Sequence, residues 1–273
     1  MAIRAGSPLA PLLRHLLIVG GACLILAGGA GYAGGRRQRP SVSRRPGTEP
    51  LVRTVARLTP SVVLVQSTSA PGRSVLGAGF CLQNSECVVT AWHLVESGTV
   101  QVGVLTEHGY DLRRAQIIGH DEPTDIAILR VPGKLAPLQL SQSEQRPGES
   151  IATIGFPYGP LINDRVAAAT SSGIVSCVRP ISVGTRRFDV LQLDCLVDEG
   201  NSGGPVFSVT GGQVLGMVTT RLTPVTAEAP SVPIGFAVAA GAIRDVVHRY
   251  VPQSTATARA GRAARTSVSS GPR

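Results

Sequence analysis

Short β-like runs separated by turn residues dominate this chain from about residue 60 to about residue 238. The runs are rich in Val, Ile and Leu and are bounded by Gly, Pro, Asn and Asp, as expected for strands. Clear examples are Ser61–Val65, Ile126–Val131, Asp189–Leu193 and Gln213–Val218. No long amphipathic helix alternates with these runs, which disfavours a parallel sheet covered by helices. The pattern therefore predicts an all-β domain.

One short helix is predicted at each end of this β-rich region. The triplet at 48–50 is suited to begin a helix, and Pro60 ends it. The apolar face of this helix is formed by Leu51, Val55 and Leu58. The second helix has apolar residues at i, i+3, i+4 and i+7 and ends before Pro252. Its apolar face is formed by Ile243, Val246, Val247 and Tyr250. We therefore expect the folded domain over residues 49–252.

The positive charge of the chain belongs to its two ends. The 273 residues carry 26 basic and 17 acidic side chains, a formal net charge of +9. Residues 1–48 contain seven Arg and residues 253–273 contain four, and neither segment contains an acidic residue. The part between them therefore has a net charge of −2, which excludes a basic, nucleic-acid-binding core. Residues 253–273 have almost no large apolar side chains and are predicted to form a disordered basic tail.

An uncharged segment of 20 residues lies between His15 and Arg36. As a helix it is just long enough to cross a bilayer, although seven of its residues are Gly. For residues 1–35 three interpretations stay open: a membrane anchor, a signal peptide cleaved near Ala33, or an organelle transit segment. Residues 36–48 are predicted to be an Arg/Pro-rich linker. We expect a membrane-anchored or secreted protein with an extracytoplasmic domain, although the excess of Arg after the segment favours the opposite side.

A glycine-rich sequence is the strongest local signal for chemistry. Residues 200–205 read Gly-Asn-Ser-Gly-Gly-Pro and follow two acidic residues. In a tight turn the N–H groups of Gly200 and Ser202 converge and can hold a developing oxyanion. Ser202 is then the candidate nucleophile, but a serine also needs an adjacent base. From this motif alone, an ordinary glycine-rich turn is an equally good interpretation.

A histidine and an aspartate upstream supply the other two groups of a catalytic triad. A strand over 88–91 leads into Trp92 and His93, a setting that the other four His residues lack, so His93 is the candidate base. Asp125 stands at the start of the apolar run at 126–129, where a buried carboxylate can orient an imidazole. Asp121 is the rival, but its position favours capping of the turn.

Taken in this order, His93, Asp125 and Ser202 make the chain resemble the HtrA/DegP-type trypsin-like serine peptidases. The resemblance extends from about Val52 to Val247. Besides the triad segments, it rests on Gly-Ala-Gly-Phe at 77–80, Thr-Asp-Ile-Ala at 124–127, Ile-Gly-Phe-Pro at 154–157, Ser-Gly-Ile-Val-Ser at 172–176 and Ile-Gly-Phe-Ala at 234–237.

This resemblance implies a chymotrypsin-like fold of two six-stranded antiparallel barrels, with the active site between them and a C-terminal helix on the second barrel. It also implies a serine endopeptidase that forms an acyl-enzyme on Ser202, acts on proteins or peptides and serves protein quality control. Homo-oligomers are common among such proteins, but the sequence does not identify an oligomer interface. Three features differ from the family: we expect no PDZ domain after the last helix, Trp92 stands beside His93, and the tail is basic.

By the same resemblance, the primary specificity pocket includes the segment six residues before the nucleophile and two later segments. The expected pocket residues are Leu196, Thr219, Thr220, Arg221, Gly235 and Phe236. Leu196 is aligned at the base of the pocket. An apolar base favours small or medium aliphatic side chains, with broad selectivity because one methylene discriminates weakly.

Four cysteines fall within the domain, an even number that is typical of an oxidising compartment where pairing is plausible. Cys81 and Cys87 flank an expected hairpin, and Cys177 and Cys195 lie on strands that flank the segment leading to Ser202. Either these two pairs form disulfides, or the four residues are separate buried thiols.

Two other functions compete with the peptidase interpretation. A chymotrypsin-like barrel can be a catalytically weak or inactive binding scaffold, although all three triad residues are present here. Residues 200–204 also fit the G-x-S-x-G elbow of an α/β-hydrolase-type esterase, with Glu228 and His248 as partners. A strand-like segment rather than a helix follows Ser202, which disfavours that fold. No H-E-x-x-H or paired C-x-x-C motif is present, so we expect no metal or cofactor.

Overall fold

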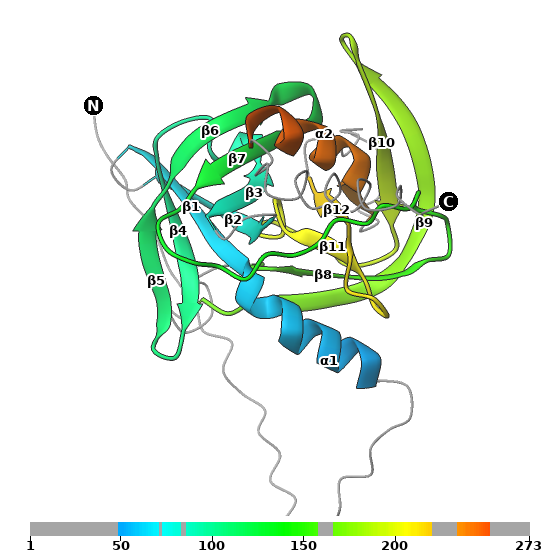
Figure 1. Cartoon of the computed structure of the whole chain (residues 1–273), viewed down its shortest axis with the longest axis horizontal. Coiled ribbons are helices and arrows are strands. Elements are labelled where there is room, and N and C mark those ends of the chain that lie inside the picture. Colours follow the sequence, from blue (N-terminus) through cyan, green and yellow to red (C-terminus); the bar gives the residue numbers. More distant parts are fainter. Residues whose placement is uncertain (1–48, 71–72, 83–85, 158–165, 220–233, 252–273) are drawn as a thin grey trace, which may run out of the picture. The chain divides into compact units, whose positions relative to one another are not determined.

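The computed structural model describes residues 49–70, 73–82, 86–157, 166–219 and 234–251. The helices α1 (Glu49–Leu58) and α2 (Ala240–Tyr250) lie where the sequence predicts them (Figure 1). The N-terminal segment with its three interpretations (anchor, signal peptide or transit segment), the linker and the basic tail lie outside the described residues. None of the described helices is long and apolar enough to cross a membrane.

The N-terminal half forms a seven-stranded sheet in the order β5-β4-β1-β2-β3-β7-β6, with antiparallel neighbours. Its strands are β1 (Val62–Ala70), β2 (Arg73–Cys81), β3 (Cys87–Ala91), β4 (Thr99–Thr106), β5 (Gly109–Arg114), β6 (Gln116–Asp121) and β7 (Ile126–Arg130). Among the described residues, the single 3-10 turn η1 (Thr59–Ser61) precedes the first strand. Two more, η2 (Trp92–Leu94) and η3 (Glu122–Thr124), lie between strands of the sheet.

This sheet has one strand more than the six expected, because a single bent stretch of chain is divided in two. Strands β5 and β6 are separated only by Ala115, yet they pair with opposite ends of the strand order, β5 with β4 and β6 with β7. At the bend, the Ala115 N–H donates to the Val100 carbonyl oxygen at 3.0 Å. The two edges of the sheet are therefore joined by one continuous segment, as in a barrel.

The C-terminal half is a closed, six-stranded antiparallel barrel in the order β10-β13-β12-β11-β8-β9. Its strands are β8 (Ser150–Gly155), β9 (Ala169–Val183), β10 (Arg186–Leu193), β11 (Pro205–Ser208), β12 (Val214–Val218) and β13 (Gly235–Ala239). The expected all-β fold with two sheet units and a C-terminal helix is confirmed (Figure 1).

A continuous hydrophobic cluster joins the two sheets and α2. It contains Phe80 and Ile128 from the first sheet, Phe207 and Met217 from the barrel, and Val246 from α2. All five side chains are fully buried. A second cluster, which includes Ile151, Leu191, Val206 and Leu215, belongs to the barrel alone. Because the shared cluster is close-packed, it fixes side chains of one sheet relative to those of the other.

Helix α2 bridges the two sheets instead of covering the barrel alone. It contacts β10, β12 and β13 of the barrel and also β6 and β7 of the first sheet. Three of the predicted apolar positions, Ile243, Val246 and Val247, are buried. The fourth, Tyr250, lies with its ring against Gly119 in β6, where a Cβ atom would collide with the ring.

Candidate active site

His93 lies in η2, directly after the fully buried strand β3. The N–H of the preceding residue, Trp92, donates to the carbonyl oxygen of Asp125 at 2.9 Å. The Trp92 ring stacks on His120 of β6, with the ring centroids 3.9 Å apart and the planes 11° apart. The backbone around His93 is therefore held from the side of β6 and η3.

Asp125 follows η3 in the left-handed conformation, with φ 55° and ψ 37°. Among the described residues it is the only non-glycine residue with a positive φ. Aspartate tolerates this conformation better than most residues, but it still stores strain that the surroundings must hold in place. The carboxylate is almost fully buried, with 2% exposure.

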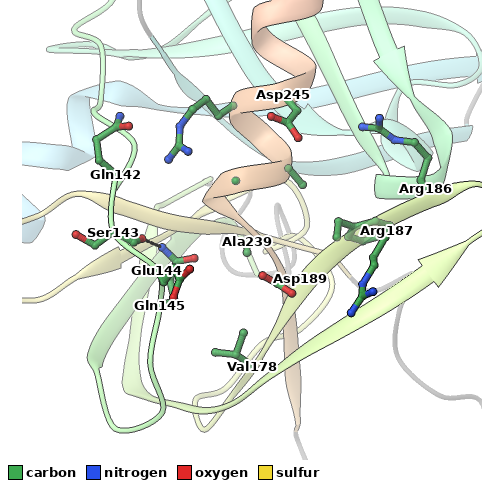
Figure 2. A pocket seen from close by; sticks show the side chains of 14 residues that line it. Gln142, Ser143, Glu144, Gln145, Val178, Arg186, Arg187, Asp189, Ala239 and Asp245 are labelled. Atoms are coloured by element: carbon green, nitrogen blue, oxygen red, sulfur yellow. Dashed lines mark hydrogen bonds between the residues drawn. The ribbon is translucent and has the colours of Figure 1, made fainter.

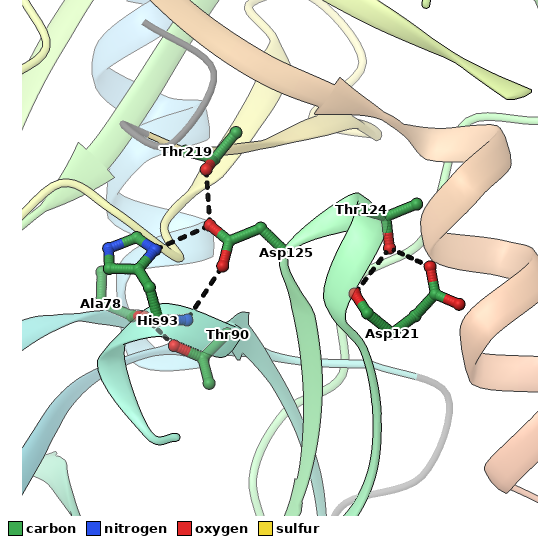
Figure 3. Close-up of polar contacts among 7 residues, drawn as sticks. All are labelled: Ala78, Thr90, His93, Asp121, Thr124, Asp125 and Thr219. Carbon is green, nitrogen blue, oxygen red and sulfur yellow. Dashed lines mark hydrogen bonds and ion pairs between the residues drawn. The ribbon is translucent and has the colours of Figure 1, made fainter. Parts of the chain in front are cut away.

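Three donors satisfy the buried carboxylate (Figure 3). Oδ1 accepts the backbone N–H of His93 at 2.9 Å, and Oδ2 lies 2.7 Å from His93 Nδ1. Oδ2 also accepts the hydroxyl of Thr219 at 2.6 Å. Because an ionised carboxylate only accepts hydrogen bonds, we assign the proton to His93 Nδ1, which leaves Nε2 as the proton acceptor.

Thr219 stands apart from its expected role as a pocket wall. Its hydroxyl points to Asp125 and its side chain is 1% exposed, so it belongs to the environment of the triad acid. The contact crosses from the residue after β12 of the barrel to the first sheet. Sequence reasoning missed it because the two residues are 94 positions apart and no local pattern pairs them.

Ser202 lies in a tight turn between β10 and β11. Gly200 and Gly203 flank it with positive φ angles of 93° and 82°, a conformation that glycine adopts without strain. The Gly200 carbonyl accepts the N–H of Phe156 at 3.0 Å, and the Ser202 carbonyl accepts the N–H of Ala78 at 2.8 Å. These bonds anchor the turn to the barrel on one side and to the first sheet on the other.

The turn around Ser202 abuts the end of β3. A Cβ atom on Gly203 would lie 2.5 Å from Thr90 Oγ1 and 2.9 Å from the Ala91 nitrogen, so only glycine fits between them. Ala91 is two residues before His93. The structure thus places the turn that carries Ser202 against the strand that leads to His93, at the junction of the two sheets.

Asp121, the rival acid, does not contact His93. Its carboxylate accepts the hydroxyl of Thr124 at 2.7 Å and Nη1 of Arg249 at 3.0 Å, and Nε of Arg186 lies 3.6 Å away. Burial raises the pKa of Asp121, but these partners outweigh it, so the pKa lies below its ordinary value. As the sequence predicts, Asp121 organises the turn rather than the imidazole.

Leu196, the expected base of the specificity pocket, does not have a buried position in this structure. Leu196 is 58% exposed, so it does not form a buried apolar floor. Its neighbour Val197 packs instead against Gly235, and the Phe236 carbonyl accepts the N–H of Thr219 at 3.0 Å. The wall residues Thr220 and Arg221 lie outside the described residues.

No disulfide links the four described cysteines, which corresponds to the second of the two alternatives, separate thiols. In the register of β2 and β3, Cys81 stands opposite Val88 rather than Cys87. Cys177 stands opposite Gln192, whereas the Cβ of Cys195 lies 3.1 Å from a Cβ placed on Gly173. Cys177 is four residues from Gly173 on β9, and four residues of a strand span about 13 Å. Cys177 and Cys195 are therefore too far apart for a disulfide. Burial raises the pKa of Cys81 to about 12 and of Cys195 to about 11, so both stay protonated.

A pocket of about 460 Å³ lies away from the triad (Figure 2). It is formed by the segment 142–145, by β9 and β10, and by the start of α2, and it contains none of the triad residues. Arg187, Asp189 and Glu144 project from its walls, so it carries both signs of charge. Within the described part of the chain, no group of three or more His, Cys, Asp or Glu residues could hold a metal ion.

Comparison with known proteins agrees with this geometry. A family model described as a trypsin-like peptidase domain matches residues 77–217. A probable periplasmic serine endoprotease, DegP-like, of Bartonella henselae is 32% identical over 179 residues, which cover 64% of this chain and 33% of that protein. A protein of the same description from Rhizobium meliloti is 31% identical over 183 residues, 66% of this chain and 34% of that protein.

The chain therefore spans about a third of the length of these curated relatives. Among solved structures, an HtrA-type protease, AlgW, with a tripeptide has the same fold, with a TM-score of 0.62 at 24% identity over 74% of this chain and 64% of that chain. The family model covers more than half of the sequence and includes all three triad residues. This chain belongs to the trypsin-like peptidase domain family.

Proposed function

We propose that the protein is a serine endopeptidase with Ser202 as nucleophile, His93 as general base and acid, and Asp125 as the residue that orients the imidazole. The observation that carries this proposal is the partly buried contact of 2.7 Å between Asp125 Oδ2 and His93 Nδ1. It leaves Nε2 of the imidazole to take a proton, which is the arrangement that activates a serine in such triads.

The reaction follows from these positions. Ser202 Oγ attacks the carbonyl carbon of a peptide bond while His93 Nε2 takes the hydroxyl proton. The N–H groups of Gly200 and Ser202 stabilise the resulting oxyanion. The intermediate collapses to an acyl-enzyme when His93 returns the proton to the leaving amine. Water, deprotonated by His93, then attacks the ester and releases the acid and Ser202.

We propose proteins or peptides as substrates and an extracytoplasmic location, with a role in protein quality control. The relatives' descriptions as periplasmic serine endoproteases support the location and the substrate class. The uncharged segment after His15 supports export or anchoring. Protease accessibility of the domain in intact cells, together with the N-terminal sequence of the mature protein, tests this location. If added protease cuts the domain only after the cytoplasmic membrane is permeabilised, the proposed extracytoplasmic location is wrong.

The catalytic assignment is tested by substitution of Ser202. We expect Ser202→Ala to lower kcat by several orders of magnitude, because the triad acts as a unit. A fluorophosphonate should label the native protein at Ser202 and should label neither Ser202→Ala nor His93→Ala. Ser182→Ala, which changes an exposed serine of β9, is the matched control and should behave as the native protein. Hydrolysis that survives Ser202→Ala would reject the assignment, and a folded native protein without labelling or hydrolysis would favour the binding-scaffold alternative.

A further inference from the structure

The last turn of α2 contacts and hydrogen-bonds the segment of the first sheet that leads to the triad acid. Arg249 Nη1 donates to Asp121 Oδ1 at 3.0 Å, and the Tyr250 hydroxyl donates to the carbonyl oxygen of His120 at 3.0 Å. The Tyr250 ring fills the space beside Gly119 that a side chain would need. Three consecutive residues at the end of β6 are therefore held by two consecutive residues of one helix.

A short chain of contacts connects Asp121 to Asp125. Oδ2 of Asp121 accepts the hydroxyl of Thr124 at 2.7 Å, and the Asp121 carbonyl lies 3.2 Å from the same hydroxyl (Figure 3). Thr124 is the last residue of η3 and is fully buried. The next residue is Asp125, whose left-handed conformation is held by its N–H bond to the Glu122 carbonyl at 3.0 Å. The conformation of the triad acid therefore depends on the Asp121 turn.

A second chain of contacts runs from Tyr250 to the triad base. Tyr250 fixes the carbonyl of His120, and the His120 ring stacks on Trp92, the residue before His93. The Trp92 N–H in turn donates to the Asp125 carbonyl. Both members of the His93–Asp125 pair are thus supported, one residue away, by groups that α2 holds.

The two arginines that contact Asp121 belong to α2 and to β10. Helix α2 directly follows β13, and Arg186 of β10 lies 3.6 Å from the same oxygen of Asp121 that Arg249 contacts. The buried carboxylate, 7% exposed, therefore receives positive charge from β10 of the barrel and from α2. A removed partner leaves a buried charge poorly compensated, which favours rearrangement of the turn.

We propose that Arg249 and Tyr250 are positioning residues that hold Asp125 and His93 in their productive geometry through Asp121 and His120. This inference rests on the proposed peptidase function, since it concerns the same triad. Neither residue is one of the three triad residues. Their effect is therefore on the chemical step rather than on substrate binding, because a misplaced catalytic group lowers the rate without altering distant binding contacts.

The test compares Arg249→Gln with Arg244→Gln in the full chain. Arg244 is the matched control, since it lies on the same helix and donates to the Ser141 carbonyl, away from β6 and η3. We expect Arg249→Gln to lower kcat on a short peptide about ten- to hundredfold with little change in KM. Arg249→Lys should recover much of the loss, and Arg244→Gln should stay close to the native value. Tyr250→Phe, which removes only the hydroxyl, should give a smaller fall of the same kind.

A readout independent of hydrolysis separates this proposal from the proposed function. The proton on His93 Nδ1, hydrogen-bonded to Asp125, gives a far-downfield NMR resonance that moves when the pair is displaced. We expect a shift in Arg249→Gln and none in Arg244→Gln, whether or not the native protein hydrolyses peptides. A native protein without activity would refute the function alone. Three outcomes in folded Arg249→Gln would overturn the positioning role: an unshifted resonance, a kcat within twofold of the native value, or a loss of kcat equal to that in Arg244→Gln. If Arg249→Gln does not fold, the same criteria apply to Tyr250→Phe.

Discussion

At the scale of single residues, Asp125 combines a strained backbone conformation, a buried carboxylate and several hydrogen bonds. A non-glycine residue in the left-handed region costs about 1–3 kcal/mol, and a buried carboxylate costs more unless it is satisfied. Its main chain bonds to Glu122 and Trp92, and its carboxylate to His93 and Thr219. These bonds offset both costs and at the same time fix the imidazole.

The acceptor-only character of Asp125 gives the first prediction. In Asp125→Asn an amide N–H can face His93, which reverses the imidazole tautomer and places a hydrogen on the nitrogen that must accept the serine proton. We expect kcat to fall about 10⁴-fold, as for such a change in other triads. Peptide hydrolysis by purified variants measures it. Asp189→Asn, an exposed site on β10, should leave kcat unchanged, and a fall below tenfold in Asp125→Asn would exclude the orienting role.

The hydroxyl of Thr219 gives the second prediction. Thr219→Val keeps the shape of the side chain but removes the donor 2.6 Å from Asp125 Oδ2. A lost hydrogen bond to a charged group is worth about 1.5–3 kcal/mol. If about half of that is felt in the transition state, kcat falls about three- to tenfold. Thr219→Ser keeps the hydroxyl and should retain most of the activity. If Thr219→Ser and Thr219→Val lose the same activity, packing rather than the hydrogen bond explains the effect.

At the scale of elements, the local patterns located helices and strands well and their partners poorly. The faces of α1 and α2, the strand before His93 and the glycine-rich turn at Ser202 are visible in short windows of sequence. The division of one bent stretch into β5 and β6, the register that separates Cys177 from Cys195, and the exposure of Leu196 depend on strands far away in the chain. No local pattern contains that information, so the sequence could neither fix the position of Leu196 nor decide between disulfides and separate thiols.

The junction of α2, η3 and β10 at Asp121 gives a prediction on stability. Because the pKa of Asp121 is lowered on folding, its carboxylate stabilises the folded state above the unfolded pKa, and this stabilisation is lost as the pH falls through the folded pKa. We expect Asp121→Asn to lower Tm at pH 7 by at least about 2–4 °C, the shift produced by about 1 kcal/mol in a domain of this size. The difference from the native protein should narrow as the pH falls below the ordinary value of 3.8.

Thermal unfolding of both proteins across this pH range measures the effect. Asp111→Asn is the control, because Asp111 is 51% exposed and its pair with Arg113 lies at the surface, where ion pairs contribute little. Its Tm should match that of the native protein at every pH. A Tm difference for Asp121→Asn that stays constant down to the acid limit would show that the carboxylate charge is not what stabilises the turn.

At the scale of the whole molecule, the two sheets behave as one folding unit because their largest hydrophobic cluster is common to both. Helix α1 belongs to the same unit. Thr54 donates to the Val209 carbonyl at 3.0 Å, Arg57 donates to the Gly211 carbonyl at 3.1 Å, and Leu58 is 3% exposed. The helix before the first sheet is thus tied to the turn between β11 and β12 of the barrel.

This arrangement predicts which ends of the chain can be removed. Residues 253–273 contain one valine as their only large apolar side chain, apart from alanines, and the described core lies within residues 51–251. We expect a protein of residues 49–252 to keep the Tm and the kcat on short peptides of the full chain. A protein of residues 59–252, which lacks α1, should unfold several degrees lower, since burial of Leu58 alone contributes about 1.5–3 kcal/mol. Calorimetry shows whether each unfolds in a single transition. Two separate transitions in residues 49–252, or an equal Tm with and without α1, would show that the shared cluster and the α1 contacts do not unite the fold.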